Sequence, residues 1–163
     1  MNRDWSKYNR GASLVEVIIG SAILTIVFIS LGGAAQYLLR FSQDANTRIR
    51  SAFLASEGIE VARLLRDQSW NTAIAPLSVG TPYYLEFSGT AWRATTTPVI
   101  VDGVFARTFV LNQVSRDAFD DIVSSGGTND TDARKVTVTV TWSSRGIQRQ
   151  DIISTYLTNL FKN

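Results

Sequence analysis

The chain has 163 residues, of which 45% are hydrophobic and 18% charged, a composition typical of a folded protein with one ordinary domain. It contains no Cys and no His, which excludes disulfides and thiolate metal sites and removes the commonest general base. The net charge of +2 lies in residues 1–11, where Arg3, Lys7 and Arg10 outnumber Asp4. The rest of the chain therefore has no basic excess that would favour binding to nucleic acid.

Residues 12–39 form an apolar run, ASLVEVIIGSAILTIVFISLGGAAQYLL, in which Glu16 is the only charged side chain. The run exceeds the roughly 20 residues that a helix needs to span a bilayer. The basic residues before it predict, by the positive-inside rule, that residues 1–10 stay in the cytoplasm and the C-terminal part lies outside. A secretory signal peptide is the alternative, because Gly33-Ala34-Ala35 has the small residues of a cleavage site. Its apolar core would be unusually long and would contain a carboxylate.

Glu16 lies three residues after Ser13, which is the spacing of a capping box at a helix N terminus. In that arrangement the two side chains satisfy backbone N–H groups of the first turn, and the carboxylate faces the positive end of the helix dipole. Capping would explain Glu16 as the start of a helix in any membrane anchor.

The segment RGASLVE, residues 10–16, followed by an apolar helix, resembles the prepilin cleavage and methylation motif of type IV pilins and pseudopilins. The resemblance implies that a membrane peptidase cleaves after Gly11, that Ala12 becomes the N-methylated terminus, and that Glu16 acts in assembly. Family members most often have Phe at the new terminus, so Ala12 departs from the pattern. The pair Gly32-Gly33 lies near the position where many pilins have a helix-distorting proline. It predicts local stretching or melting of the helix.

Cleavage would place a cationic amine at Ala12, four residues before the carboxylate of Glu16. A carboxylate inside a bilayer costs about 2.5–3.5 kcal/mol unless it is paired. The terminal amine of a neighbouring subunit would pair with Glu16 and fix the axial register between subunits. A pair between the Ala12 amine and Glu16 of the same chain is the alternative, and the sequence does not separate the two.

The same resemblance implies a set of partners and a location. The partners are a prepilin peptidase with methyltransferase activity, other pilin-like subunits, an inner-membrane assembly platform and a cytoplasmic assembly ATPase. The precursor would cross the cytoplasmic membrane once, with its N terminus in the cytoplasm, and the mature subunit would join an extracytoplasmic filament.

Residues 40–67 continue the helical pattern among charged residues. Joined to the apolar run, they predict one helix from Ser13 to Asp67, roughly 55 residues and about 80 Å long. We expect its apolar stripe to pack in a core, with residues 71–80 as a connector marked by Pro76 and Gly80. The apolar residues at helical spacing are Phe41, Ala45, Ile49, Ala52 or Phe53, Ile59 and Ala62.

Residues 81–160 change to the alternating pattern of β-strands. The clearest strand is KVTVTVTW, residues 135–142, with Val136, Val138, Val140 and Trp142 on one face and threonines on the other. We expect four or five antiparallel strands packed on the helical extension. The predicted fold is therefore α+β, a pilin-like head with a long N-terminal helix.

Five aspartates lie in or beside an expected long loop, residues 116–134: Asp117, Asp120, Asp121, Asp130 and Asp132. Oxygen-rich loops can bind calcium, but this spacing is not that of an EF-hand, and a solvated, turn-rich loop explains the same residues. We predict no metal site. The chain also lacks a nucleophile elbow, a phosphate-binding loop and a dinucleotide fingerprint, so we predict neither an enzyme nor a bound cofactor.

The sequence thus predicts a structural subunit, a minor pilin or pseudopilin of a type IV pilus or a type II secretion-like filament. Residues 1–11 would be the leader, 12–39 the transmembrane and assembly helix, and 40–163 the extracytoplasmic head. The alternative is an extracytoplasmic binding module, either anchored by one membrane span or secreted.

Overall fold

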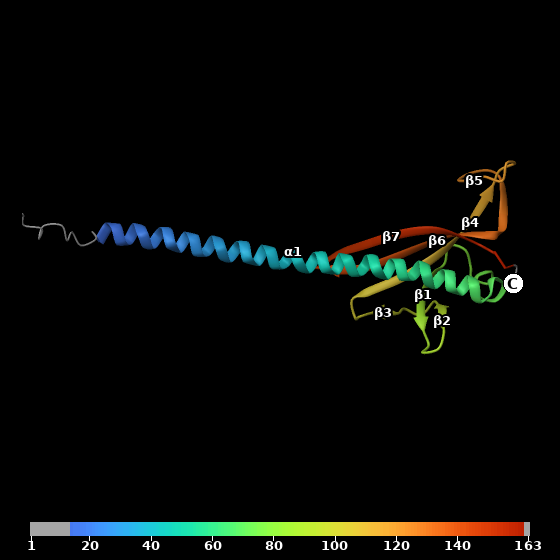
Figure 1. Ribbon diagram of the computed structural model, residues 1–163, viewed down its shortest axis with the longest axis horizontal. Helices are drawn as coiled ribbons and strands as arrows, with labels where there is room; N and C mark the ends of the chain where they lie inside the picture. Colours follow the sequence, from blue (N-terminus) through green and yellow to red (C-terminus); the bar gives the residue numbers. More distant parts are fainter. Residues whose placement is uncertain (1–13, 162–163) are drawn as a thin grey trace, which may run out of the picture. The chain divides into compact units, whose positions relative to one another are not determined.

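A computed structural model describes residues 14–161, which begin with one long helix and continue into a β-sheet (Figure 1). Helix α1 spans Leu14–Gln68, so it ends within one residue of the predicted bound, and the predicted start at Ser13 lies outside the described residues. The chain divides into two compact units within this helix, between Ala45 and Asn46. We call the second unit the head and describe each unit by itself.

Within the head, helix α1 packs on the sheet through a stripe of mostly small residues. The expected stripe is wrong in part, because Ile59 and Ala62 are buried but Ile49 and Phe53 are 55% and 72% exposed. The sheet approaches so closely that a Cβ on Gly58 would lie 2.8 Å from a methyl group of Val138. The face of α1 that contacts the sheet is therefore the one with small side chains, and large side chains such as Phe53 lie on the exposed face. The stripe consists of Ser51, Ala55, Gly58, Ala62 and Leu65, spaced alternately by four and three residues.

A single π-helical turn, η1 (Trp70–Ile74), follows α1 in the segment where the sequence predicted only a connector. The Ser69 hydroxyl caps this turn by accepting a hydrogen bond from the Thr72 backbone N–H at 3.3 Å. Trp70 is 2% exposed and Ile74 is fully buried. The turn thus anchors the end of the helix in the core.

The sheet has seven strands, all paired antiparallel, in the order β2-β1-β4-β6-β7, with the short strands β3 and β5 paired to β4. The predicted α+β class is confirmed: a long N-terminal helix packs on an antiparallel sheet, as in a pilin. The strands are β1 (Pro82–Phe87), β2 (Trp92–Thr95), β3 (Ile100–Val101), β4 (Phe105–Arg116), β5 (Ile122–Val123), β6 (Thr128–Ser144) and β7 (Ile147–Thr158).

The core lies between α1 and the inner face of β4, β6 and β7. The predicted faces of the strand at 135–142 are confirmed, because Val136, Val138 and Val140 are fully buried and Trp142 is 6% exposed. Phe109 of β4 is also fully buried at the centre of this cluster. Each such side chain contributes about 1.5–3 kcal/mol to folding when it leaves water.

The β4–β6 ladder is interrupted, and the expected loop at 116–134 is consequently wrong in part. Gln113 pairs with Arg134 but the next residue, Val114, pairs with Asp130, so the partner number steps by four where a regular ladder steps by one. Beyond this shift the end of β4, the strand β5 and the start of β6 form a three-stranded extension (Figure 1). We call this extension, residues 114–130, the arm.

Candidate functional site

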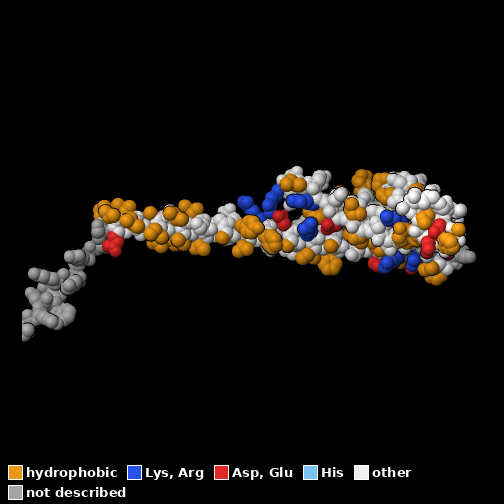
Figure 2. Space-filling model, turned by 90° about the horizontal axis from the view of Figure 1, so that it is seen from above, with side chains coloured by type: hydrophobic (Ala, Val, Ile, Leu, Met, Phe, Trp, Pro, Cys, Tyr) orange, Lys and Arg blue, Asp and Glu red, His pale blue; other side chains and the backbone are white. Residues whose placement is uncertain are grey.

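The part of α1 that precedes the head exposes its apolar side chains on every side. Their exposed fractions run from 45% for Val27 to 76% for Leu14, and Figure 2 shows this half of the helix covered with hydrophobic side chains. By length and composition this is the one helix in residues 14–161 able to cross a membrane. The exposed residues are Leu14, Val15, Val17, Ile18, Ile19, Ile23, Leu24, Ile26, Val27, Phe28, Ile29, Leu31, Leu38 and Leu39.

Glu16 lies in the first turn of α1 and is exposed among these apolar residues. Its neighbours in the sequence, Val15 and Val17, are each 60% exposed. The predicted cleavage and methylation positions, Gly11 and Ala12, lie outside the described residues, as does the capping residue Ser13. The structure therefore places the carboxylate at the start of an apolar helix and does not describe a partner for it.

The hydroxyl groups of this apolar helix are satisfied by the helix itself. Ser21 donates to the Ile18 carbonyl at 2.9 Å, Thr25 to the Ser21 carbonyl at 2.8 Å, and Ser30 to the Ile26 carbonyl at 2.8 Å. Such bonds remove the cost of placing a hydroxyl in hydrocarbon, where no water can replace them. These polar residues are thus compatible with an apolar surrounding.

The glycines of the apolar helix lie in regular helix. The predicted stretching at Gly32-Gly33 is not observed, since α1 is continuous from Leu14 to Gln68. No heavy atom lies within 4 Å of the position that a Cβ would take on Gly20, Gly32 or Gly33. A flat surface at these positions lets another helix approach closely.

The aspartates of the arm are organised around Arg116. The Arg116 Nε atom donates to Asp130 at 2.7 Å, and Nη1 donates to the Asp120 carbonyl at 2.8 Å. The hydrogen bond from Arg116 lowers the pKa of Asp130, and the same bond raises the pKa of Arg116. An open polar hollow of about 530 Å³ lies beside them. Within residues 14–161 no three Asp or Glu side chains come together as a ligand set for a metal ion.

Sequence reasoning missed a buried cation, Arg107, which is 3% exposed on the inner face of β4. Its Nη1 atom donates to the Leu54 carbonyl at 3.2 Å and to the carboxylate of Glu57, and its guanidinium lies 5.5 Å from the Trp92 ring centroid. The alternation of β4 could have revealed it, because Arg107 occupies an inward position between Phe105 and Phe109. Its contacts join α1 to the sheet, which assigns it a structural role.

Comparisons with models of protein families, with curated proteins and with solved structures gave no match to this chain. A functional interpretation therefore depends on the residues themselves.

Proposed function

We propose that the chain is a structural subunit, a minor pilin or pseudopilin, of a type IV pilus or type II secretion-like filament. The precursor is inserted in the cytoplasmic membrane, cleaved after Gly11 by a prepilin peptidase, and assembled through the apolar part of α1. The observation that supports this most directly is the exposed apolar helix with Glu16 as its single charge.

The exposed helix supports the proposal because water is an unfavourable surrounding for it. A side chain such as Phe28, 70% exposed, gains free energy when lipid tails or other helices replace water around it. The self-satisfied hydroxyls of Ser21, Thr25 and Ser30 allow that transfer. A bilayer would hold this surface before assembly, and neighbouring helices would cover it in a filament.

Glu16 then determines how subunits join. In lipid its carboxylate requires a cationic partner, and cleavage after Gly11 would create one at the Ala12 amine of the next subunit. The pair would form at one axial offset between neighbouring helices. The assembly platform and its ATPase would supply the work of extracting each subunit from the membrane.

The mature N terminus tests the proposal and separates it from the alternatives. Mass spectrometry of the protein recovered from cells is expected to give a chain that begins at Ala12. A chain that begins at Met1 would indicate a permanently anchored binding module, and one that begins near Gln36 a secreted one. Either result would contradict the proposed function.

The first mutational prediction concerns Glu16→Ala. We expect this variant to be inserted and cleaved but to enter filaments at least about tenfold less, since a pairing energy of about 1.4 kcal/mol already corresponds to a tenfold change. The measurement is the amount of subunit in filaments sheared from the cells. Glu60→Ala is the matched control, because Glu60 is an exposed carboxylate of the same helix that pairs with Arg63 within α1. Normal incorporation of Glu16→Ala would remove the assembly role.

A further inference from the structure

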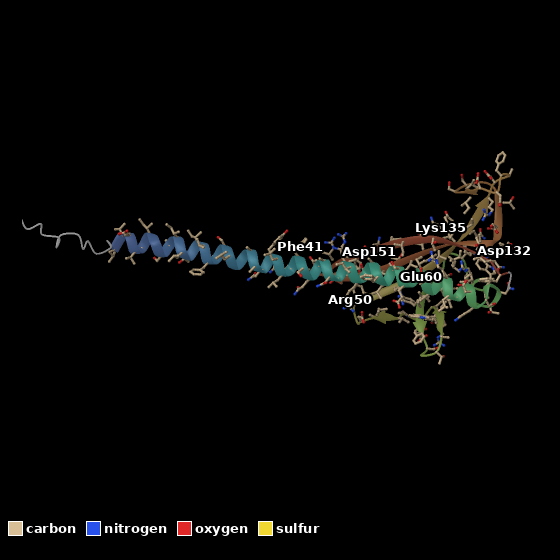
Figure 3. The ribbon with its side chains drawn as sticks, viewed as in Figure 1. Phe41, Arg50, Glu60, Asp132, Lys135 and Asp151 are labelled. Carbon is tan, nitrogen blue, oxygen red and sulfur yellow. The ribbon has the colours of Figure 1, made fainter. Side chains whose placement is uncertain are left out.

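The head has two opposite ends, which the sheet register defines. At one end, which we call the turn end, Ser144 pairs with Ile147 across the β6–β7 turn, and the β3–β4 turn at Asp102 lies beside it. At the other end, the arm end, Ala133 pairs with Thr158 and the arm extends from β4 and β6. Figure 3 shows Arg50 and Asp151 toward the turn end and Asp132 at the arm end.

These two ends have opposite charge. The turn end has four arginines, Arg48, Arg50, Arg145 and Arg149, against Asp102 and Asp151. Residues 116–134 at the arm end have five aspartates against two arginines, Arg116 and Arg134. Figure 2 shows most of the Lys and Arg side chains of this view toward the left of the head, with acidic side chains among them, and side chains of both charges in its right half. The counted residues therefore give the turn end a net positive charge and the arm end a net negative charge.

Each end also exposes large apolar side chains beside its charges. At the arm end Phe119 is 87% exposed, and Leu160 and Phe161 are 62% and 64% exposed. At the turn end Ile147 is 56% and Val104 50% exposed. Aromatic side chains that are exposed within a charged rim are typical anchors of protein interfaces.

The arm holds Phe119 in an ordered turn. The Asp117 carboxylate accepts hydrogen bonds from the backbone N–H groups of Phe119 at 2.8 Å and of Asp121 at 3.0 Å. The side chain of Arg116 fixes the same turn through the Asp120 carbonyl. An anchor that is already ordered loses little conformational entropy when it binds.

We propose that the arm end of one copy docks on the turn end of the next copy, with the arm aspartates facing Arg145 and Arg149 and Phe119 packing against Ile147. A second copy is the occupant that fits best, because the chain itself supplies the complementary charge and apolar surface. The contact joins two different patches, so it does not end at a dimer, and with the helices parallel and offset along one axis it repeats as an open filament rather than a ring. The inference rests on the proposed function for the parallel orientation of the subunits.

The path of α1 through the head agrees with that orientation. The helix enters the head at the turn end, where Ser51 contacts Asp151, and ends at the arm end, where the Trp70 ring lies 5.8 Å from the Arg134 guanidinium. Copies whose helices run parallel and are offset along the filament therefore present an arm end to a turn end.

Cysteine cross-linking in the full-length chain tests the contact, since the protein has no Cys of its own. Ala118→Cys in the arm and Gln148→Cys at the turn end are both exposed positions. In membranes of cells that express the doubly substituted chain, a bismaleimide linker is expected to give a ladder of dimers, trimers and larger species. Each singly substituted chain has no second Cys at this contact and is expected to stay monomeric. Ala118→Cys with Ser154→Cys, an exposed position in the middle of β7, is the control and should give no ladder.

Charge reversal tests the electrostatic part of the contact. Asp121→Lys and Arg149→Asp, each added to the doubly cysteine-substituted chain, are expected to reduce the ladder about threefold, the size of effect typical of exposed ion pairs. The two reversals together should restore it, and added salt should weaken the ladder of the chain without reversals. Neither side chain makes a side-chain hydrogen bond or a salt bridge within residues 14–161, and although Asp121 also attracts Arg116, the hydrogen bond of Arg116 to Asp130 remains in the Asp121→Lys chain.

The outcomes separate this inference from the proposed function. A doubly cysteine-substituted chain that is cleaved at Ala12 and forms filaments without a ladder overturns the docking contact and leaves the function in place. A ladder of equal strength in the Ser154 control, or one indifferent to charge reversal, also overturns it. A chain that keeps Met1 overturns the proposed function, and a charge-dependent ladder from that chain supports the contact between heads on its own.

Discussion

The two units of this protein differ in whether their apolar side chains are buried. In the head, Phe109 and Val138 are fully buried, and the core between helix and sheet needs no partner. In the helix that precedes it, Phe28 and Ile29 are each 70% exposed, and nothing in residues 14–161 covers them. The head buries its apolar side chains against one another, whereas the helix before it leaves its apolar side chains exposed and is long and apolar enough to cross a membrane. One chain thus combines a folded core with a long helix whose apolar surface no described residue covers.

The largest expected effect that tests this comparison comes from truncating one aromatic residue in each unit. Phe109→Ala should lower the free energy of unfolding of the head by about 3–5 kcal/mol, because it leaves a cavity in a closed core. Phe28→Ala should leave that free energy unchanged, since its side chain packs on nothing within the head. Both are measured on the full chain in detergent by guanidinium unfolding, with the fluorescence of the buried Trp70 and Trp142 as the signal. Equal losses of unfolding free energy in the two variants would contradict the view that only the head has a closed core.

A smaller effect is expected from adding one methyl group to a glycine of each unit. Gly58→Ala puts a Cβ 2.8 Å from Val138 and 3.3 Å from Arg107, an overpacking that costs about 1–3 kcal/mol. Better helix propensity offsets about 1 kcal/mol of this cost. Gly33→Ala meets no heavy atom within 4 Å and should not lower the stability. The same guanidinium assay measures the free energy of unfolding of both variants. A higher free energy of unfolding for Gly58→Ala would contradict the prediction and would show that the helix can move away from the sheet.

The smallest effect is an acid-dependent loosening of the arm. Because Arg116 lowers the pKa of Asp130 in the folded state, this carboxylate adds stability above its unfolded pKa of about 4. That contribution is lost as the pH falls through the lowered folded value. Backbone hydrogen exchange at residues 128–130 should therefore quicken between pH 6 and pH 3, after correction for intrinsic rates. Asp130→Asn should exchange faster at pH 6 and respond less to acid, and an unchanged response would exclude this ion pair as the cause.

Much of the fold could be predicted because its patterns are local. The continuous helix and its C-terminal end were predicted to within one residue, since the apolar run and its charged extension share one period. The strand at 135–142 was predicted with the correct face inward, because Val and Thr alternate without a break. In both cases a single property, apolar periodicity, determines the structure.

The predictions were wrong where side-chain size determines which face of the helix is buried, and where pairing between distant residues determines which segments form strands. Phe53 looked like a core residue, but the stripe that contacts the sheet consists of small residues such as Ala55 and Gly58, which allow close approach. The sequence predicts a loop where the arm lies, because the strands of the arm are short and depend on a register shift after Gln113 that no local pattern encodes. The structure tests only part of the candidate site. It shows Glu16 in an exposed apolar helix, whereas the roles of Gly11 and Ala12 remain predictions from sequence.

The long strands of the head run alongside α1, because Ser51, Gly58 and Trp70 contact Asp151, Val138 and Arg134 in that order. Strand β6 is paired with β7 without interruption from Ala133 to Ser144. A pulling force directed along the helix would consequently load this whole set of hydrogen bonds in shear, all together, instead of peeling them apart one after another. Within the head, the β6–β7 ladder would therefore resist a force along this part of α1 as one unit.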